Sequence, residues 1–190
     1  ELTFDFSAGQ NDPNNNNIVL FFNIETTAAA TLYYDDFKLY ARDTTGGGGG
    51  GGTGDCPAAP AGDLISNGDF EAGNVGCWLF FPGSSLSTTI NNGGTNSGQI
   101  QGETGRAVNF KQERFAIGVV EPNTSYTVTF DIISDSDFGE GGLFKAFTFS
   151  EPAEGSDVGA VLHVLTDNTT ALSTSWETNS YFFSRNRSCD

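Results

Sequence analysis

The sequence lacks methionine altogether, and it has one histidine and only 8 lysine and arginine residues against 24 acidic ones. Proteins bind nucleic acids mainly through lysine and arginine contacts to phosphates, so a net charge of −16 excludes nucleic acid as an expected partner. Apolar runs are short, and none approaches the roughly 18 residues of a membrane-spanning helix. Because methionine is absent, we expect the 190 residues to be a processed product or one piece of a longer protein.

Patterns of catalytic residues are missing as well. His163, the only histidine, lies in the strand-like stretch AVLHVL, and no serine-histidine, cysteine-histidine or zinc-ligand pattern accompanies it. The glycine run at 46–52 lacks the lysine of a phosphate-binding loop. Acidic pairs are numerous, but in so acidic a chain they are weak evidence for glycoside hydrolysis. We therefore expect a non-catalytic protein.

Cysteine is scarce and odd in number, with Cys56, Cys77 and Cys189. One disulfide, for which Cys56 with Cys77 is a candidate pairing, would leave a third thiol and raise the question of a bond between chains. Three triplets have the form of N-glycosylation acceptors, at Asn123, Asn168 and Asn186. Together with the lack of charged helices, these features indicate an extracellular or cell-surface protein.

Helical periodicity is almost absent, whereas alternation of polar and apolar residues recurs along the chain. The stretch SYTVTFDIIS places Tyr126, Val128, Phe130 and Ile132 on one face of a strand. Further strands are expected at 2–7, 17–27, 31–40, 105–111, 114–120, 141–150, 159–165 and 175–184. Turns rich in Asn, Gly and Ser separate them, and 17 phenylalanines supply an aromatic core. Many short strands with polar turns indicate a β-sandwich or barrel.

Four stretches resemble jelly-roll carbohydrate-binding modules. LISNGDFEAGNVGCW at 64–78 resembles their opening, which commonly has an Asn-Gly-x-Phe-Glu element followed by a tryptophan. NTSYTVTFDI at 123–132 is similar to their central strand, and TSWETNSYFFS at 174–184 is similar to a later one. The segment at 1–40, which ends in TLYYDDFKLY, is similar to the strands that close the fold. The resemblance implies an all-β jelly-roll sandwich of two antiparallel sheets.

The order of these elements is unusual, because the closing strands of the family precede its opening strands. We therefore divide the chain into closing strands at 1–43, a Gly- and Pro-rich linker at 44–62 and the main body of the jelly roll at 63–190. The closing strands can fold back onto their own body, complete a neighbouring copy, or belong to a tandem array cut at an arbitrary point. The positions expected to complete the sandwich are Leu2, Phe4, Phe6, Val19, Phe21, Phe37 and Leu39.

Asp35 in YYDDFKL shares strand parity with Phe37 and Leu39, so we expect it to point into the sandwich. A buried carboxylate needs hydrogen-bond donors or a metal ion. In the family that the sequence resembles, the equivalent aspartate and the glutamate of the Asn-Gly-x-Phe-Glu element bind a structural calcium ion. The resemblance therefore implies calcium at Asp35 and Glu71, with backbone oxygens as further ligands. Backbone hydrogen bonds to Asp35 without an ion are the alternative.

Glycan binding is the activity that the resemblance implies. Trp78 and Trp176 align with family positions that pack in the core, so neither is expected to contact a sugar. A sugar-binding face would have to use tyrosine or phenylalanine rings or the polar residues His163, Arg106, Lys111, Gln99 and Gln101. Arg106 and Lys111 lie at opposite parities of one expected strand.

Two functions follow from these observations. The first is structural: a repeating subunit of a surface fibre or tandem array, assembled by strand complementation between neighbouring copies. The alternative is a glycan-binding module of a secreted, polysaccharide-active protein. Concentration-dependent filaments would support the first, and retention of a monodisperse protein on a polysaccharide column would support the second.

Overall fold

The fold is built from β-strands. The computed structural model describes residues 2–6, 18–41, 56–73, 77–115, 125–150 and 161–187. The strands are β1 (Leu2–Phe6), β2 (Ile18–Thr26), β3 (Thr31–Ala41), β4 (Trp78–Phe80), β5 (Ser84–Ser87), β6 (Ser97–Gln101), β7 (Val108–Phe115), β8 (Ser125–Ser134), β9 (Phe138–Ser150), β10 (Val161–Leu172) and β11 (Glu177–Arg187). Within these ranges we find no helix with the length and apolarity needed to cross a membrane.

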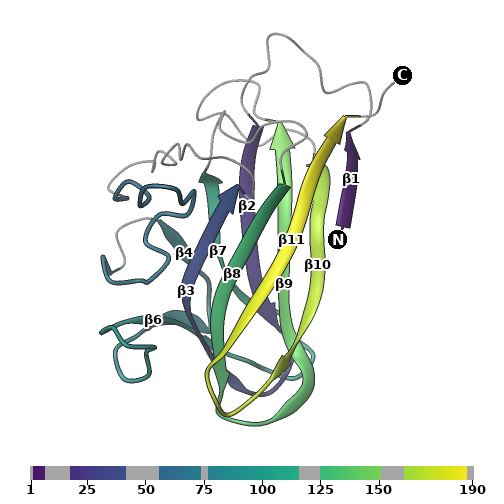
Figure 1. Ribbon diagram of the computed structural model, residues 1–190. Coiled ribbons are helices and arrows are strands. Elements are labelled where there is room, and N and C mark those ends of the chain that lie inside the picture. Colours follow the sequence, from purple (N-terminus) through teal and green to yellow (C-terminus); the bar gives the residue numbers. More distant parts are fainter. Residues whose placement is uncertain are drawn as a thin grey trace.

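The strands form two sheets that pack face to face as a sandwich (Figure 1). The first sheet has the order β1-β11-β8-β3-β6-β5, and the second has the order β10-β9-β2-β7-β4. Pairing between the described strands is antiparallel except at the edge of the first sheet, where β1 runs parallel to β11. The prediction of an all-β jelly-roll sandwich with two antiparallel sheets is confirmed.

The residues before the glycine run supply a central strand to each sheet. In the second sheet β2 lies between β7 and β9, and in the first sheet β3 lies between β6 and β8. All these pairings join segments of one chain. Phe37 and Leu39, two of the positions expected to complete the sandwich, are buried in the core. The other five lie in β1 and β2, and their side chains are outside the described part of the structure.

Exchange of these strands between neighbouring copies stays a prediction, and so do the domain boundaries. Residues 44–55 of the expected linker lie outside the described ranges.

The core is an aromatic cluster to which both sheets contribute. The ring centroid of Phe37 lies 5.0 Å from that of Phe130 and 5.1 Å from that of Trp78. From the second sheet, Phe110 approaches Trp78 at 5.4 Å. Aromatic pairs at such separations contribute about 0.5–1.5 kcal/mol beyond their buried area. Trp78 therefore packs as predicted, whereas Trp176 is only half-buried in the turn before β11, so the prediction that it packs in the core is wrong.

The Asn-Gly-x-Phe-Glu element runs beside β3, beyond the residues that pair with β6. The Leu64 amide donates to the Leu39 carbonyl at 2.8 Å, and the Phe37 amide donates to the Gly68 carbonyl at 3.0 Å. The approach requires glycine at 68, because a Cβ there would lie 1.9 Å from the Phe37 carbonyl oxygen. Asp63 extends the contact, since its Oδ1 accepts the Leu39 amide at 2.8 Å.

A disulfide joins Cys56 to Cys77, with the two Cα atoms 5.0 Å apart. The next residue, Trp78, donates its indole N–H to the Asn67 carbonyl at 2.8 Å. These two links hold the start of β4 against the segment 56–73. Cys189 lies outside the described residues.

Two expectations about strands are wrong in detail. The sequence predicts separate strands at 105–111 and 114–120, but β7 continues without a break to Phe115. The apparent polar interruption includes Gln112, which is buried and donates its side-chain amide to the Ser66 carbonyl at 2.9 Å. The strands β4, β5 and β6 are missed because they are short and β5 and β6 are rich in small polar residues.

Candidate functional site

Two rows of side chains cross the outer face of the second sheet. The register places Lys111 of β7 opposite Asn23 of β2, and Asn23 opposite Lys145 of β9. The second row crosses β7, β2, β9 and β10 in the same way, and its residues are, in that order, Asn109, Glu25, Leu143 and Thr169. Side chains alternate between the faces of a strand, and the residues between these positions, Phe22, Ile24, Phe110 and Phe144, are buried in the core.

Hydrogen bonds join the polar side chains of the two rows. Asn109 Nδ2 donates to Asn23 Oδ1 at 3.0 Å, and Asn23 Nδ2 donates to Glu25 Oε2 at 2.8 Å. The other carboxylate oxygen of Glu25 lies 3.5 Å from Lys145 Nζ. The side chains of Lys145 and Glu25 are 26% and 16% exposed, so this ion pair is partly shielded from water. The network holds amide, carboxylate and ammonium groups of three strands in defined orientations at the surface.

An aromatic ring lies at one end of the rows. Leu79 of β4 is 39% exposed, and Phe81, which has the same strand parity, is 38% exposed. Lys111 Nζ lies 5.3 Å from the centroid of the Phe81 ring, within the range of a cation–π interaction. Arg106 Nη2 donates to the Pro82 carbonyl at 2.9 Å and so supports the turn that carries Phe81.

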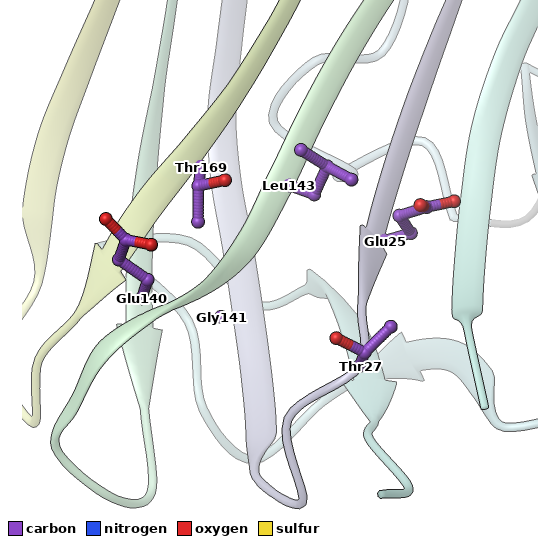
Figure 2. Close-up of a pocket in the computed structure, with 6 residues that line it drawn as sticks. All are labelled: Glu25, Thr27, Glu140, Gly141, Leu143 and Thr169. Carbon is purple, nitrogen blue, oxygen red and sulfur yellow. The ribbon is translucent and has the colours of Figure 1, made fainter. Parts of the chain in front are cut away.

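A pocket of about 240 Å³ opens at the other end of the rows, beside the ends of β2, β9 and β10. Its lining residues are Glu25, Thr27, Glu140, Gly141, Leu143 and Thr169. Figure 2 shows Glu140 and Thr169 on one side, Glu25 and Thr27 on the other, and Leu143 between them. Because the pocket shares three residues with the second row, the rows and the pocket form one continuous surface.

The structure distributes three of the residues predicted to contact sugars over different places. Lys111 lies on the outer face of the second sheet. Arg106 precedes β7, where its Nε also lies 3.5 Å from Glu103 Oε2, so it belongs to a turn and not to the strand. His163 lies in β10 opposite Thr148, and its side chain is outside the described part.

The sequence does not single out Asn23, Glu25 and Lys145 as surface groups of one site. Their alternation with buried aromatic and aliphatic residues marks each as outward-facing. What no local pattern indicates is that β2 and β9 are neighbours, which brings Lys145 beside the other two.

Asp35 is buried, but not for the reason given by strand parity. Tyr34 points into the core, and a register shift between Asp35 and Lys38 brings Phe37 back to the core side. Asp36, with φ of 53°, belongs to the β-bulge that causes this shift. Simple strand parity therefore does not explain the burial of Asp35, which lies against the loop at 91–96 and accepts the Asn92 amide.

The two residues predicted to bind calcium both hold this loop. Asp35 Oδ2 accepts the Asn92 amide at 2.9 Å, and Glu71 Oε1 accepts the Thr95 and Asn96 amides, each at 2.8 Å. Burial raises the pKa of Asp35 to about 6 against the effect of two backbone amide bonds, and the charges of Asp36 and Glu71 add to the rise. Hydrogen bonds from Thr95 and Asn96 lower the pKa of Glu71.

These carboxylates fit the oxygen chemistry that calcium prefers, and a cation would offset the repulsion between them. Among the residues that the structure describes, no group of three or more His, Cys, Asp or Glu side chains could hold a metal ion. Backbone oxygens would therefore have to complete a site at Asp35 and Glu71.

Comparison with protein families matches residues 62–188 to a carbohydrate-binding domain. The chain belongs to this family. Neither the curated proteins nor the solved structures include a match to the chain. The matched region begins beside Asp63 and ends one residue after β11, so β2 and β3 lie outside it although each is a central strand of its sheet. Domains of this family are non-catalytic in themselves, and they bind carbohydrate.

Proposed function

We propose that the domain binds polysaccharide through the outer face of the β10-β9-β2-β7-β4 sheet, as the sugar-binding part of a polysaccharide-active protein. The observation that carries the proposal is the hydrogen-bonded set Asn109, Asn23, Glu25 and Lys145. Sugar hydroxyl groups both donate and accept hydrogen bonds, and amide, carboxylate and ammonium groups together offer both functions. The exposed ring of Phe81 adds an apolar surface for the C–H face of a sugar.

The dimensions of this face suit an oligosaccharide. Four spacings of about 4.8 Å separate β4 from β10, so the rows extend over roughly 19 Å. A sugar chain that crosses the strands would contact Phe81 near one end and the pocket at the other. The family match supports this function over the fibre subunit, because it concerns carbohydrate and not self-assembly.

The test is retention on a panel of immobilised polysaccharides, followed by titration calorimetry with the retained sugar. Phe81→Ala should weaken binding about tenfold, because one stacked ring contributes roughly 1–1.5 kcal/mol. Ile90→Ala is the matched control, since Ile90 is 39% exposed but lies in the loop before β6, in the first sheet. Equal affinity of the two variants, or no retention on any polysaccharide, would contradict the proposal.

We also propose that a structural calcium ion is held by Asp35 and Glu71 with backbone oxygens. When bound, the ion would add hard Lewis-acid charge at the junction of β3, the Asn-Gly-x-Phe-Glu element and the loop at 91–96. Its role would be to stabilise that junction, which lies on the first sheet and apart from the sugar-binding face.

An extracellular location is proposed for the domain. The Cys56–Cys77 disulfide supports it, because disulfides persist in oxidising compartments. Glycosylation stays a prediction at each of the three acceptors. Asn168 lies in β10 and Asn186 in β11, while Asn123 is outside the described residues.

A further inference from the structure

The pocket beside β2, β9 and β10 differs from the rest of the outer face in its charge. None of its six lining residues is basic, and two of them, Glu25 and Glu140, are carboxylates on opposite sides of the opening (Figure 2). The hydroxyl groups of Thr27 and Thr169 and the apolar side chain of Leu143 complete the lining.

A break in strand register lies beside this pocket. On β9, Phe138 pairs with Leu172 and Gly142 pairs with Thr170, so β9 has extra residues between the two pairs. This irregularity contains Glu140 and places it at the rim of the pocket. The neighbouring position 141 is crowded, because a Cβ there would lie 2.8 Å from Leu172 Cδ1 and 2.9 Å from Ala28 Cβ.

Partly buried hydrogen bonds hold the irregular segment in place. Thr26 is fully buried, and its hydroxyl donates to the Gly141 carbonyl at 2.5 Å. The same oxygen accepts the Ala28 amide at 3.0 Å, which defines the path of the chain through Thr27. The chain segments that carry the lining residues of β2 and β9 are therefore joined beside the pocket.

The electrostatic field at the pocket is negative. Glu25 shares one carboxylate oxygen with Lys145 at 3.5 Å, which offsets part of its charge, whereas Glu140 is exposed. The whole chain carries a net charge of −16, which repels anionic polymers and attracts cationic ones. A neutral sugar would gain nothing from this field, but a positively charged one would gain a charge-assisted hydrogen bond.

We propose that the pocket binds a protonated amino sugar, such as a 2-amino-2-deoxyhexose unit of a polysaccharide; this rests on the proposed function of the outer face. The ammonium group bonds to the Glu140 carboxylate, the threonine hydroxyls bond to ring hydroxyls, and Leu143 contacts the C–H face. A volume of about 240 Å³ suits one sugar ring, since pockets for larger ligands begin near 300 Å³. A bare divalent cation is disfavoured, because it needs six or more converging oxygens and no apolar wall.

The test uses three β-1,4-linked trisaccharides that share one backbone and differ only at carbon 2: those of glucosamine, N-acetylglucosamine and glucose. Calorimetry is done at mildly acidic pH, where the sugar amine is protonated and glutamate is still largely ionised. The glucosamine trimer should bind about tenfold more tightly than the other two, because a hydrogen bond to a charged group contributes roughly 1.5–3 kcal/mol. High salt should reduce this advantage.

Glu140→Gln should abolish the preference for the glucosamine trimer, so that this variant binds the glucosamine and glucose trimers with the same affinity. Glu177→Gln is the matched control, because Glu177 is exposed and lies in β11 of the first sheet, and it should change neither value. Equal affinity for all three trimers, preference for the acetylated one, or no effect of Glu140→Gln overturns the inference. Should neutral polysaccharides bind while the amine gives no advantage, the inference fails but the proposed function stands; no binding to any polysaccharide removes both.

Discussion

Glu25 and Lys145 are 120 residues apart in the chain, yet the Oε1 atom of one lies 3.5 Å from the Nζ atom of the other. The contact exists because β2, which precedes the glycine run, lies between β7 and β9 in the middle of the second sheet. The proposed sugar-binding face therefore combines residues from both sides of the run. Residues 62–188 match the family, but without β2 they would lack Asn23 and Glu25.

Removal of calcium tests the site at Asp35 and Glu71. If the ion is bound, calcium should raise the melting temperature of the protein and a chelator should lower it. Asp35→Ala should abolish this difference, because the variant has lost one carboxylate ligand. Scanning calorimetry with calcium and with chelator checks both expectations. Equal melting of the unmodified protein under the two conditions would rule the site out.

The pH dependence of stability tests the environment of Asp63. Burial raises the pKa of Asp63 above 3.8, although the amides of Ile65 and Leu39 oppose the rise. The pKa of Asp63 is therefore higher in the folded than in the unfolded state. In that case the Asp63 carboxyl contributes its full stabilisation of the fold at pH values below its unfolded pKa. This contribution is lost as the pH rises through the folded pKa.

Asp63→Asn removes the ionisation and leaves an oxygen that can accept both amides. The variant should therefore lose less stability than the original protein as pH rises above 3.8. Melting temperatures across that range measure the difference. Asp63→Ala is the comparison, since it should be less stable at every pH through loss of the bonds to Leu39 and Ile65. Parallel pH profiles for Asp63→Asn and the original protein would show that the carboxyl is not perturbed.

Tyr34 and Tyr181 together test how much free energy of unfolding is lost when a tyrosine hydroxyl group is buried without a hydrogen-bond partner. Tyr34 Oη is buried and finds no hydrogen-bond partner among the described residues, whereas Tyr181 Oη lies 2.6 Å from Thr170 Oγ1. Tyr34→Phe should leave the free energy of unfolding unchanged or raise it by about 1 kcal/mol, and Tyr181→Phe should lower it by about 1 kcal/mol. Chemical denaturation measures both. A loss for Tyr34→Phe as large as that for Tyr181→Phe would indicate a partner for Tyr34.

Gly68 tests the close approach of the Asn-Gly-x-Phe-Glu element to β3. Gly68→Ala places a Cβ 1.9 Å from the Phe37 carbonyl oxygen, and backbone atoms on both sides would have to move. We expect a loss of about 3 kcal/mol or more in the free energy of unfolding, in the range of severe packing defects. Gly139→Ala is the control, because a Cβ at that position meets nothing within 4 Å. Similar stability of the two variants would refute the contact.

Much of the fold follows from local patterns. Alternation identifies β2, β3, β8, β9 and β11, and the phenylalanines account for the core. The elements that escape prediction are short or interrupted: β5 and β6 consist mostly of serine, glycine and glutamine, whose burial depends on what packs over them. Asp35 shows a second limit, because a single bulge at Asp36 reverses the parity on which its predicted direction rested.

From its sequence alone the protein is determined to be acidic, all-β and similar to carbohydrate-binding modules, because composition, period-two alternation and the Asn-Gly-x-Phe-Glu element are local properties. Only the tertiary structure decides that β2 and β3 become central strands, that Lys145 meets Glu25, and that Glu140 reaches the rim of a pocket. The reason is physical: alternation determines which side of a strand is buried, but the neighbour of each strand depends on contacts between segments far apart in the chain.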